Sequence, residues 1–206
     1  MKSITLFPTL QKTVADWTGQ PIDENRKADL QVLIDYIQSK VDQQKTAQLN
    51  FICTHNSRRS HLTQLWAKVA ADYHQVPADT YSGGVEVTAF NERAVASLQR
   101  AGFKVEAEGD ENPRYSMSYA EEAAPQVAFS KLFDDAVNPS AEYASIMTCS
   151  HADENCPVLF GAEARIPLRY EDPKAFDGTA EEGQKYDERS AQIANELFYA
   201  FSKIKK

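Results

Sequence analysis

The feature that most constrains the fold of this chain is the segment Cys53-Thr54-His55-Asn56-Ser57-Arg58-Arg59-Ser60, which has the pattern C-x5-R-S. It follows an apolar run at residues 49–52 that predicts a short buried strand. It precedes a helical pattern whose apolar positions fall on one face: Leu62, Leu65, Trp66, Val69 and Tyr73. A tight loop that enters a helix points unpaired backbone N–H groups inward, and the helix dipole adds partial positive charge there. We call residues 53–60 the anion loop, because this arrangement favours a tetrahedral oxyanion.

The side chains of the anion loop indicate nucleophilic chemistry on the bound anion. Its positive field stabilises a thiolate at Cys53, the form of cysteine that attacks electrophiles. Arg59 is able to fork two hydrogen bonds onto the oxyanion. The expected substrate-binding set is Thr54, His55, Asn56, Ser57, Arg58, Arg59 and Ser60, in which Ser60 donates to the sulfur and Asn56 braces the loop. The alternative is that Cys53 is only a buried residue at a strand end, a common place for cysteine.

The remaining pattern alternates strands and helices and predicts an α/β fold. From residue 49 we expect strands at 49–52, at 80–87 with a break at Gly83-Gly84, and at 126–130, 144–148 and 165–168. We expect one helix that Asn91 caps and Gly102 ends, and another at 180–203. Residues 1–47 contain helical patterns at 10–17 and 24–44, the second capped by Asp23. We therefore predict an N-terminal helical arm (residues 1–47) and a single domain (residues 48–206) with a mainly parallel central sheet flanked by helices.

Composition excludes several classes of function. The chain has 206 residues and a net charge of −8, with a pI of about 5.1, so no general field draws it to nucleic acid or to an anionic membrane. Its N-terminus does not read as a signal peptide, and no run approaches the ~20 apolar residues that span a bilayer. It contains three cysteines, an odd number that argues against a disulfide framework. We expect a cytoplasmic protein that uses its thiols.

The other two cysteines lie close together in the sequence Cys149-Ser150-His151-Ala152-Asp153-Glu154-Asn155-Cys156-Pro157. On a loop after a strand, this spacing suits a redox segment that folds back to bring its ends together. The alternative is a metal site made of Cys149, His151, Asp153 and Cys156, but the spacing does not match a structural zinc site. We therefore predict thiol exchange, with no bound metal and no cofactor.

At these residues the chain resembles the low-molecular-weight tyrosine phosphatase superfamily, and within it the thioredoxin-coupled arsenate reductases. The resemblance covers residue 49 to the C-terminus. It rests on the C-x5-R-S loop after the first strand, on the later cysteine pair with acidic and Asn residues between and Pro after, and on Asp172-Pro173. In the superfamily a late Asp-Pro supplies the general acid, so the resemblance gives that role to Asp172.

The resemblance implies arsenate reduction, an activity of arsenical resistance, through a relay of three thiols. Cys53 attacks arsenate held by Arg59, Cys149 then attacks Cys53, and Cys156 attacks Cys149 to leave a disulfide that thioredoxin reduces. The expected partners are arsenate or phosphate, thioredoxin, and a second copy of the chain held through the arm. Two alternatives stay open: a tyrosine phosphatase that uses Cys53, Arg59 and Asp172, and an arsenite-binding or thiol-sensing protein without turnover.

Two features depart from the family pattern. Family members commonly have Gly at the third loop position, where this chain has His55, whose side chain either narrows the pocket or faces solvent. Residues 109–125, which include Tyr115 and Tyr119, are longer than a minimal domain requires and match no family motif.

Overall fold

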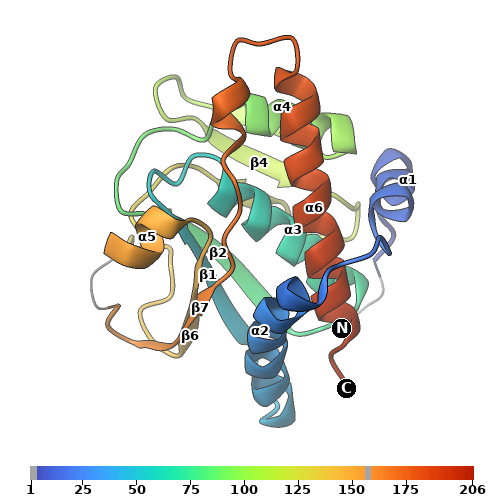
Figure 1. Cartoon of the computed structure of the whole chain (residues 1–206), viewed down its shortest axis with the longest axis vertical. Coiled ribbons are helices and arrows are strands. Elements are labelled where there is room, and N and C mark those ends of the chain that lie inside the picture. The colour runs from blue at the N-terminus through green and yellow to red at the C-terminus, as the bar shows by residue number, and fades with distance from the viewer. Residues whose placement is uncertain (1–3, 156–158) are drawn as a thin grey trace.

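The computed structural model describes residues 4–155 and 159–206 (Figure 1). Its centre is a four-stranded sheet in the order β2-β1-β6-β7, in which every neighbouring pair is parallel. The strands are β1 (Ala47–Cys53), β2 (Ala78–Gly84), β6 (Tyr143–Met147) and β7 (Ala162–Pro167). The predicted fold class, a parallel central sheet flanked by helices, is confirmed. β2 is shorter than expected: it ends at Gly84, opposite Cys53, because β1 ends there and the anion loop begins.

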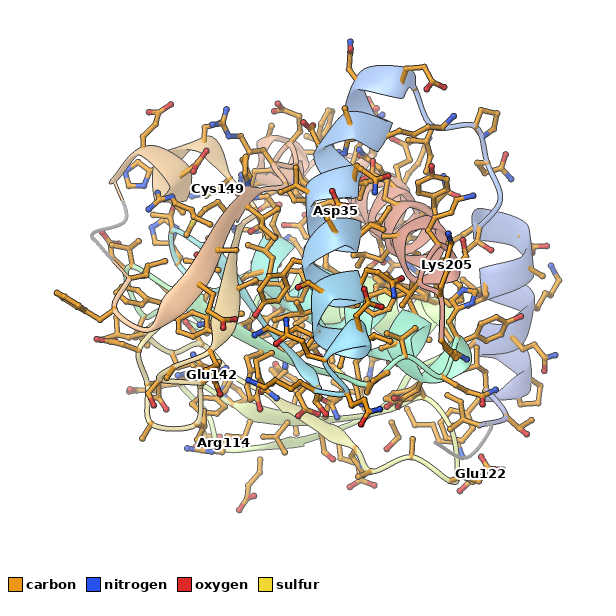
Figure 2. The ribbon with its side chains drawn as sticks, turned by 90° about the horizontal axis from the view of Figure 1, so that it is seen from below. Asp35, Arg114, Glu122, Glu142, Cys149 and Lys205 are labelled. Atoms are coloured by element: carbon orange, nitrogen blue, oxygen red, sulfur yellow. The ribbon has the colours of Figure 1, made fainter. Side chains whose placement is uncertain are left out.

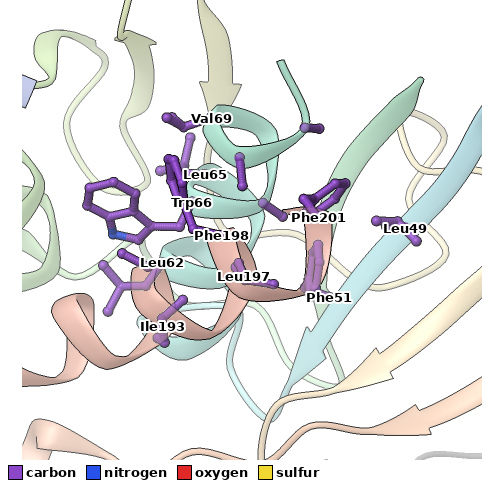
Figure 3. Close-up of a cluster of buried hydrophobic side chains, with 14 of the residues drawn as sticks. Leu49, Phe51, Leu62, Leu65, Trp66, Val69, Ile193, Leu197, Phe198 and Phe201 are labelled. Carbon is purple, nitrogen blue, oxygen red and sulfur yellow. The ribbon is translucent and has the colours of Figure 1, made fainter. Parts of the chain in front are cut away.

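Helices cover the sheet and surround the main core. They are α2 (Glu24–Asp42), α3 (Arg59–Tyr73), α4 (Glu92–Ala101) and α6 (Glu182–Ser202). α3 packs on β1 and β2, α2 packs on β1 and β7, and α6 lies against both of these helices. Figure 3 shows the apolar stripes of α3 and α6 facing each other beside β1. Trp66 at this contact is fully buried and its indole N–H donates to Ser190 Oγ at 2.8 Å, so its polar group has a partner.

Local capping residues set the helix ends where the sequence predicts them. Asp23 accepts a hydrogen bond from the Arg26 N–H at the start of α2, and Asn91 accepts one from the Arg93 N–H at the start of α4. Gly102 ends α4 with a left-handed backbone, φ 112°. Among the described residues, no helix combines the length and the apolar composition that a bilayer crossing needs.

The N-terminal arm shares the core of the main domain. It consists of α1 (Pro8–Trp17) and α2, and both contact α6. Its buried apolar side chains belong to the same cluster as those of the sheet: Leu10, Val14, Leu30, Leu33, Ile34 and Ile37. Helices that bury their apolar face against the sheet and α6 are part of one packed body. The boundary at residue 47 stays a prediction.

A second, antiparallel sheet occupies residues 104–128, most of which sequence patterns left unassigned. It has the order β3-β4-β5 and is made of β3 (Lys104–Glu108), β4 (Arg114–Ser118) and β5 (Gln126–Ala128). The strand expected at 126–130 therefore belongs to this sheet rather than to the central one. Tyr119, just after β4, is buried and its hydroxyl donates to Asp72 Oδ2 of α3 at 2.6 Å, which anchors this region to the main domain.

Candidate active site

The anion loop lies at the carboxyl end of β1 and leads into α3, as the sequence predicts. Several of its carbonyl groups accept hydrogen bonds from segments outside the loop. The Cys53 and Thr54 carbonyls accept from the N–H groups of Val85 and Glu86, and the Ser57 carbonyl accepts from the N–H of Asn91. Within the described part of the chain, the backbone N–H groups of residues 54–58 have no acceptor. Free N–H groups at a helix N-terminus form an anion site.

A chain of hydrogen bonds reaches the nucleophile from inside the protein. Cys53 Sγ lies 3.1 Å from Ser60 Oγ, and Ser60 Oγ accepts from Asn56 Nδ2 at 2.8 Å. Asn56 Oδ1 in turn accepts from the backbone N–H of Lys131 at 3.0 Å. Asn56 has a positive φ of 44°, a conformation that Asn tolerates better than most residues, and its side-chain bonds hold it there. Ser60 therefore lies next to the Cys53 sulfur, and Asn56 joins Ser60 to the segment after β5.

Gly84 at the end of β2 allows the anion loop to pack closely on the sheet. A Cβ at this position would lie 2.6 Å from the backbone N of Asn56 and 2.9 Å from the backbone C of His55. Both atoms are backbone, so no side-chain rotation would relieve the contact. The glycine is therefore a condition for the shape of the loop.

Two segments outside the anion loop hold its His55 carbonyl, and sequence reasoning missed both. Ser130 Oγ, fully buried just after β5, donates to His55 O at 2.9 Å, and Thr88 Oγ1 donates to the same carbonyl at 3.2 Å. The Asn112 side chain holds Ser130 in place: its Nδ2 donates to the Ser130 carbonyl at 2.8 Å, and its Oδ1 accepts from the Ser130 N–H at 3.1 Å. No local signal marks these residues, because they lie 33 or more positions from His55 along the chain.

Arg59 and Asp172 come together at the mouth of the loop. Arg59 Nη2 lies 2.8 Å from Asp172 Oδ2, and its Nη1 donates to the carbonyl of Tyr170 at 3.1 Å. Asp172 is partly exposed and caps the short 3-10 helix η1 (Pro173–Phe176). Arg58 lies on the other side of the same carboxylate: its Nε is 3.9 Å from Asp172 Oδ1 and donates to the hydroxyl of Tyr186 at 2.9 Å. The arginine at the end of the motif therefore faces the carboxyl group expected to act as the acid.

Cys149 lies in the same small buried cluster as Cys53. β6 is the neighbour of β1, and the N–H of Thr148 donates to Ile52 O at 2.8 Å, which sets the two strand ends side by side. The cluster consists of Ile52, Cys53, Met147, Cys149 and Ala152. Both cysteines are free thiols, and Cys149 precedes the short helix α5 (Ser150–Asn155) (Figure 2). Cys156 lies outside the described residues.

Two other residues of the metal alternative, Asp153 and His151, have polar partners in the structure, and Cys156 lies outside the described residues. Asp153 pairs with Arg165 and Arg169, and these arginines lower the pKa of its carboxyl group against the opposing effect of burial. His151 Nδ1 lies 3.2 Å from Thr54 Oγ1. Over residues 4–155 and 159–206, no group of three potential ligands among His, Cys, Asp and Glu gathers.

Two buried basic residues, His61 and Lys131, lie behind the loop. His61, on the first turn of α3, stacks on Phe90 with ring centres 4.0 Å apart, and its Nδ1 is 3.1 Å from Ser82 Oγ. Burial, reinforced by the charge of Lys131, lowers the pKa of His61 well below its ordinary value, so its ring is neutral. Neither His61 nor Lys131 was singled out from the sequence.

A pocket of about 470 Å³ lies beside the anion loop. His55, Ser57 and Arg58 form one wall, so His55 lines this pocket and does not simply face solvent. The aromatic rings of Phe90 and Tyr115 form another part, and Tyr115 comes from the second sheet. The site therefore offers room for a group larger than the anion itself.

Comparisons with known proteins agree with the sequence motifs. No family model matches the chain. It is 27% identical over 124 residues to an arsenate reductase of Staphylococcus epidermidis. The matched segment covers 60% of this chain and 76% of that protein. It is 26% identical over 153 residues to an arsenate reductase of Bacillus licheniformis, with 74% and 92% covered.

The fold is also found among solved structures. A low-molecular-weight protein tyrosine phosphatase of T. tengcongensis superposes with a TM-score of 0.50 at 12% identity. The match covers 77% of this chain and 100% of that protein. At this level of identity the likeness concerns the fold.

Proposed function

We propose that the chain is an arsenate reductase with the fold of the low-molecular-weight tyrosine phosphatases, and that it reduces arsenate to arsenite with its own cysteines. The observation that carries the proposal is that Cys149 and Cys53 share one buried cluster at the ends of adjacent strands. A phosphatase needs the anion loop but has no use for a second thiol in that place. Phosphate and arsenate have the same shape and charge, so the loop alone does not separate the two activities.

In the first step, the free N–H groups of the loop and Arg59 hold the arsenate. The Cys53 thiolate forms a bond to arsenic, and Asp172 protonates the oxygen that leaves as water. The position of Asp172 beside Arg59 supports this role, because the same arginine then contacts the anion and the acid.

In the second step, the Cys149 thiolate attacks Cys53 Sγ. A sulfur–sulfur bond forms and the sulfur–arsenic bond breaks. Its electron pair stays on arsenic, which leaves as arsenite, and the two cysteines are oxidised to a disulfide. Cys149 Sγ lies 3.5 Å from Thr54 Oγ1, a hydroxyl placed to donate to a thiolate.

In the third step, Cys156 attacks Cys149 Sγ, forms a Cys149–Cys156 disulfide and releases the Cys53 thiolate. A six-residue helix is about 9 Å long, whereas a disulfide needs Cα atoms within about 7 Å. We therefore propose that α5 unwinds during this step. Thioredoxin then reduces the disulfide, which places the protein in the cytoplasm, where thiols are kept reduced. Pairing of two chains through the arm stays a prediction.

The test follows NADPH consumption with arsenate, thioredoxin and thioredoxin reductase. We expect Cys149→Ser and Cys156→Ser to abolish multiple turnover, while Glu154→Ala, an exposed position on α5, retains it. Cys156→Ser should still release one equivalent of arsenite per chain, because the first two steps do not need Cys156. Full turnover by Cys156→Ser would refute the relay.

A tyrosine phosphatase is the second candidate, favoured by the pocket beside the loop. Its rings, Phe90 and Tyr115, suit the organic part of a phosphate ester. Hydrolysis of p-nitrophenyl phosphate by the same preparation distinguishes the two activities. Rapid hydrolysis that persists in Cys149→Ser, without arsenate-dependent NADPH consumption, would assign the chain to the phosphatases.

A further inference from the structure

The N-terminal arm reaches the active-site region through Arg26 on α2. The Arg26 side chain is only 13% exposed, and its Nε and Nη2 donate to Glu196 Oε2 of α6 at 2.9 and 2.8 Å. Its guanidinium carbon lies 4.6 Å from the centre of the Tyr170 ring, a cation–π distance. Burial opposes the charge of Arg26, but Tyr170 and Glu196 outweigh it and keep its pKa above the ordinary value. The arm thus places a permanent cation on Tyr170.

Tyr170 joins this contact to the functional side chains. It is buried, and its backbone N–H donates to Thr148 O at 3.1 Å. Its carbonyl accepts the Nη1 hydrogen bond of Arg59, and Asp172, two residues later, contacts Nη2 of the same arginine. Any shift of the Tyr170 backbone therefore moves an acceptor of Arg59 and the carboxyl group beside it together.

Docking of the arm does not by itself require this arginine. The neighbouring α2 residues Leu30, Leu33 and Ile37 are completely buried in the main core and hold the helix by apolar contact. A buried ion pair often contributes no more stability than apolar residues of the same size, because both charges lose their hydration. Stability of the arm therefore does not explain why the Arg26–Glu196 pair lies against Tyr170.

We infer that Arg26 is a positioning residue: it fixes Tyr170, so that the Tyr170 carbonyl aligns Arg59 on the anion and Asp172 stays beside it. This role gives the N-terminal arm a part in the active site. The inference rests on the anion site of the proposed function, but not on the cysteine relay.

The test measures inorganic phosphate binding through protection of Cys53 against iodoacetamide, followed by mass spectrometry of the Cys53 peptide. Arg26→Met should raise the half-protecting phosphate concentration about tenfold, the loss expected when one charge-assisted hydrogen bond is misaligned. The alkylation rate without phosphate should stay within about twofold, because the loop N–H groups that stabilise the thiolate are untouched. Lys27→Met, the next residue on α2, whose ammonium pairs with Glu24, is the matched control and should bind phosphate normally.

A second variant covers the case in which Arg26→Met folds poorly because Glu196 is left buried without its partner. The double variant Arg26→Gln with Glu196→Gln removes both charges together, and we expect it to weaken phosphate protection as well. Normal protection in the double variant, or equal weakening in Lys27→Met, overturns the inference. A purely structural role would instead speed alkylation of Cys53 and Cys149 alike and lower the melting temperature.

The outcomes separate this inference from the proposed function. If the wild-type protein binds phosphate but never turns over arsenate, the reductase proposal fails and the role of Arg26 stands on the binding data. If phosphate does not protect Cys53 in the wild-type protein, the anion site itself fails and the inference falls with it.

Discussion

Replacing Lys131 with methionine should stabilise the protein at neutral pH. Lys131 lies just after β5 with only 4% of its surface exposed, and its Nζ is 4.8 Å from the centre of the Phe129 ring. Among the described residues no carboxylate forms an ion pair with it. Burial lowers its pKa from 10.5 to about 8; Asp135 opposes this shift and Arg114 adds to it.

The size and the sign of the effect follow from these two pKa values. Between pH 8 and pH 10.5 the unfolded chain holds the proton more tightly than the folded one, so stability rises with pH across this window. Each pKa unit corresponds to about 1.4 kcal/mol, so charged Lys131 costs the folded state roughly 3 kcal/mol at pH 7. The cost is complete below pH 8 and disappears above pH 10.5. Methionine has a similar length and carries no charge, and it avoids this cost.

Urea unfolding of the wild-type protein and of Lys131→Met, at several pH values from 7 to 10.5, measures the difference. We expect the variant to be more stable by roughly 3 kcal/mol at pH 7, with the gain shrinking as the pH rises. Other groups that titrate in this range cancel in the difference. Lys205→Met, at an exposed lysine, should show little change at any pH. An equal difference at pH 7 and pH 10, or a variant less stable at pH 7, would refute the reasoning.

Three further predictions concern the anion loop. Gly84→Ala should lower stability by about 1–3 kcal/mol in thermal melts and raise the half-protecting phosphate concentration at Cys53, because its Cβ would meet backbone atoms of the loop. Gly183→Ala on α6, where a Cβ meets nothing closer than 3.9 Å, is the control and should not weaken binding. Ser130→Ala should weaken phosphate binding about fivefold by removing a donor from the His55 carbonyl, whereas Ser116→Ala, on β4, should not. Asp172→Asn should slow single-turnover arsenite release, followed by rapid quench, by about 10²-fold or more, because the departing oxygen loses its proton donor. Normal binding by Gly84→Ala or by Ser130→Ala, or a normal rate for Asp172→Asn, would contradict the role assigned to that residue.

Features that depend on residues close together in the chain could be predicted from the sequence. A thiol, six further residues and a serine between a buried strand and an amphipathic helix indicate an anion loop, because backbone geometry and the helix dipole act locally. The caps at Asp23, Asn91 and Gly102 follow from the same short-range chemistry. The parallel sheet follows from alternating strands and helices.

The tertiary structure decided which distant segments complete the site. Cys149 lies near Cys53 because β1 and β6 are neighbours in the sheet, an order that periodicity does not reveal. Residues 104–128 fold as an antiparallel sheet that brings Ser130 to the His55 carbonyl, and α2 brings Arg26 to Tyr170. Such contacts join residues 75 or more positions apart. A sequence pattern records the side chains that one element presents, whereas the partner that meets them is chosen by the packing of the whole core.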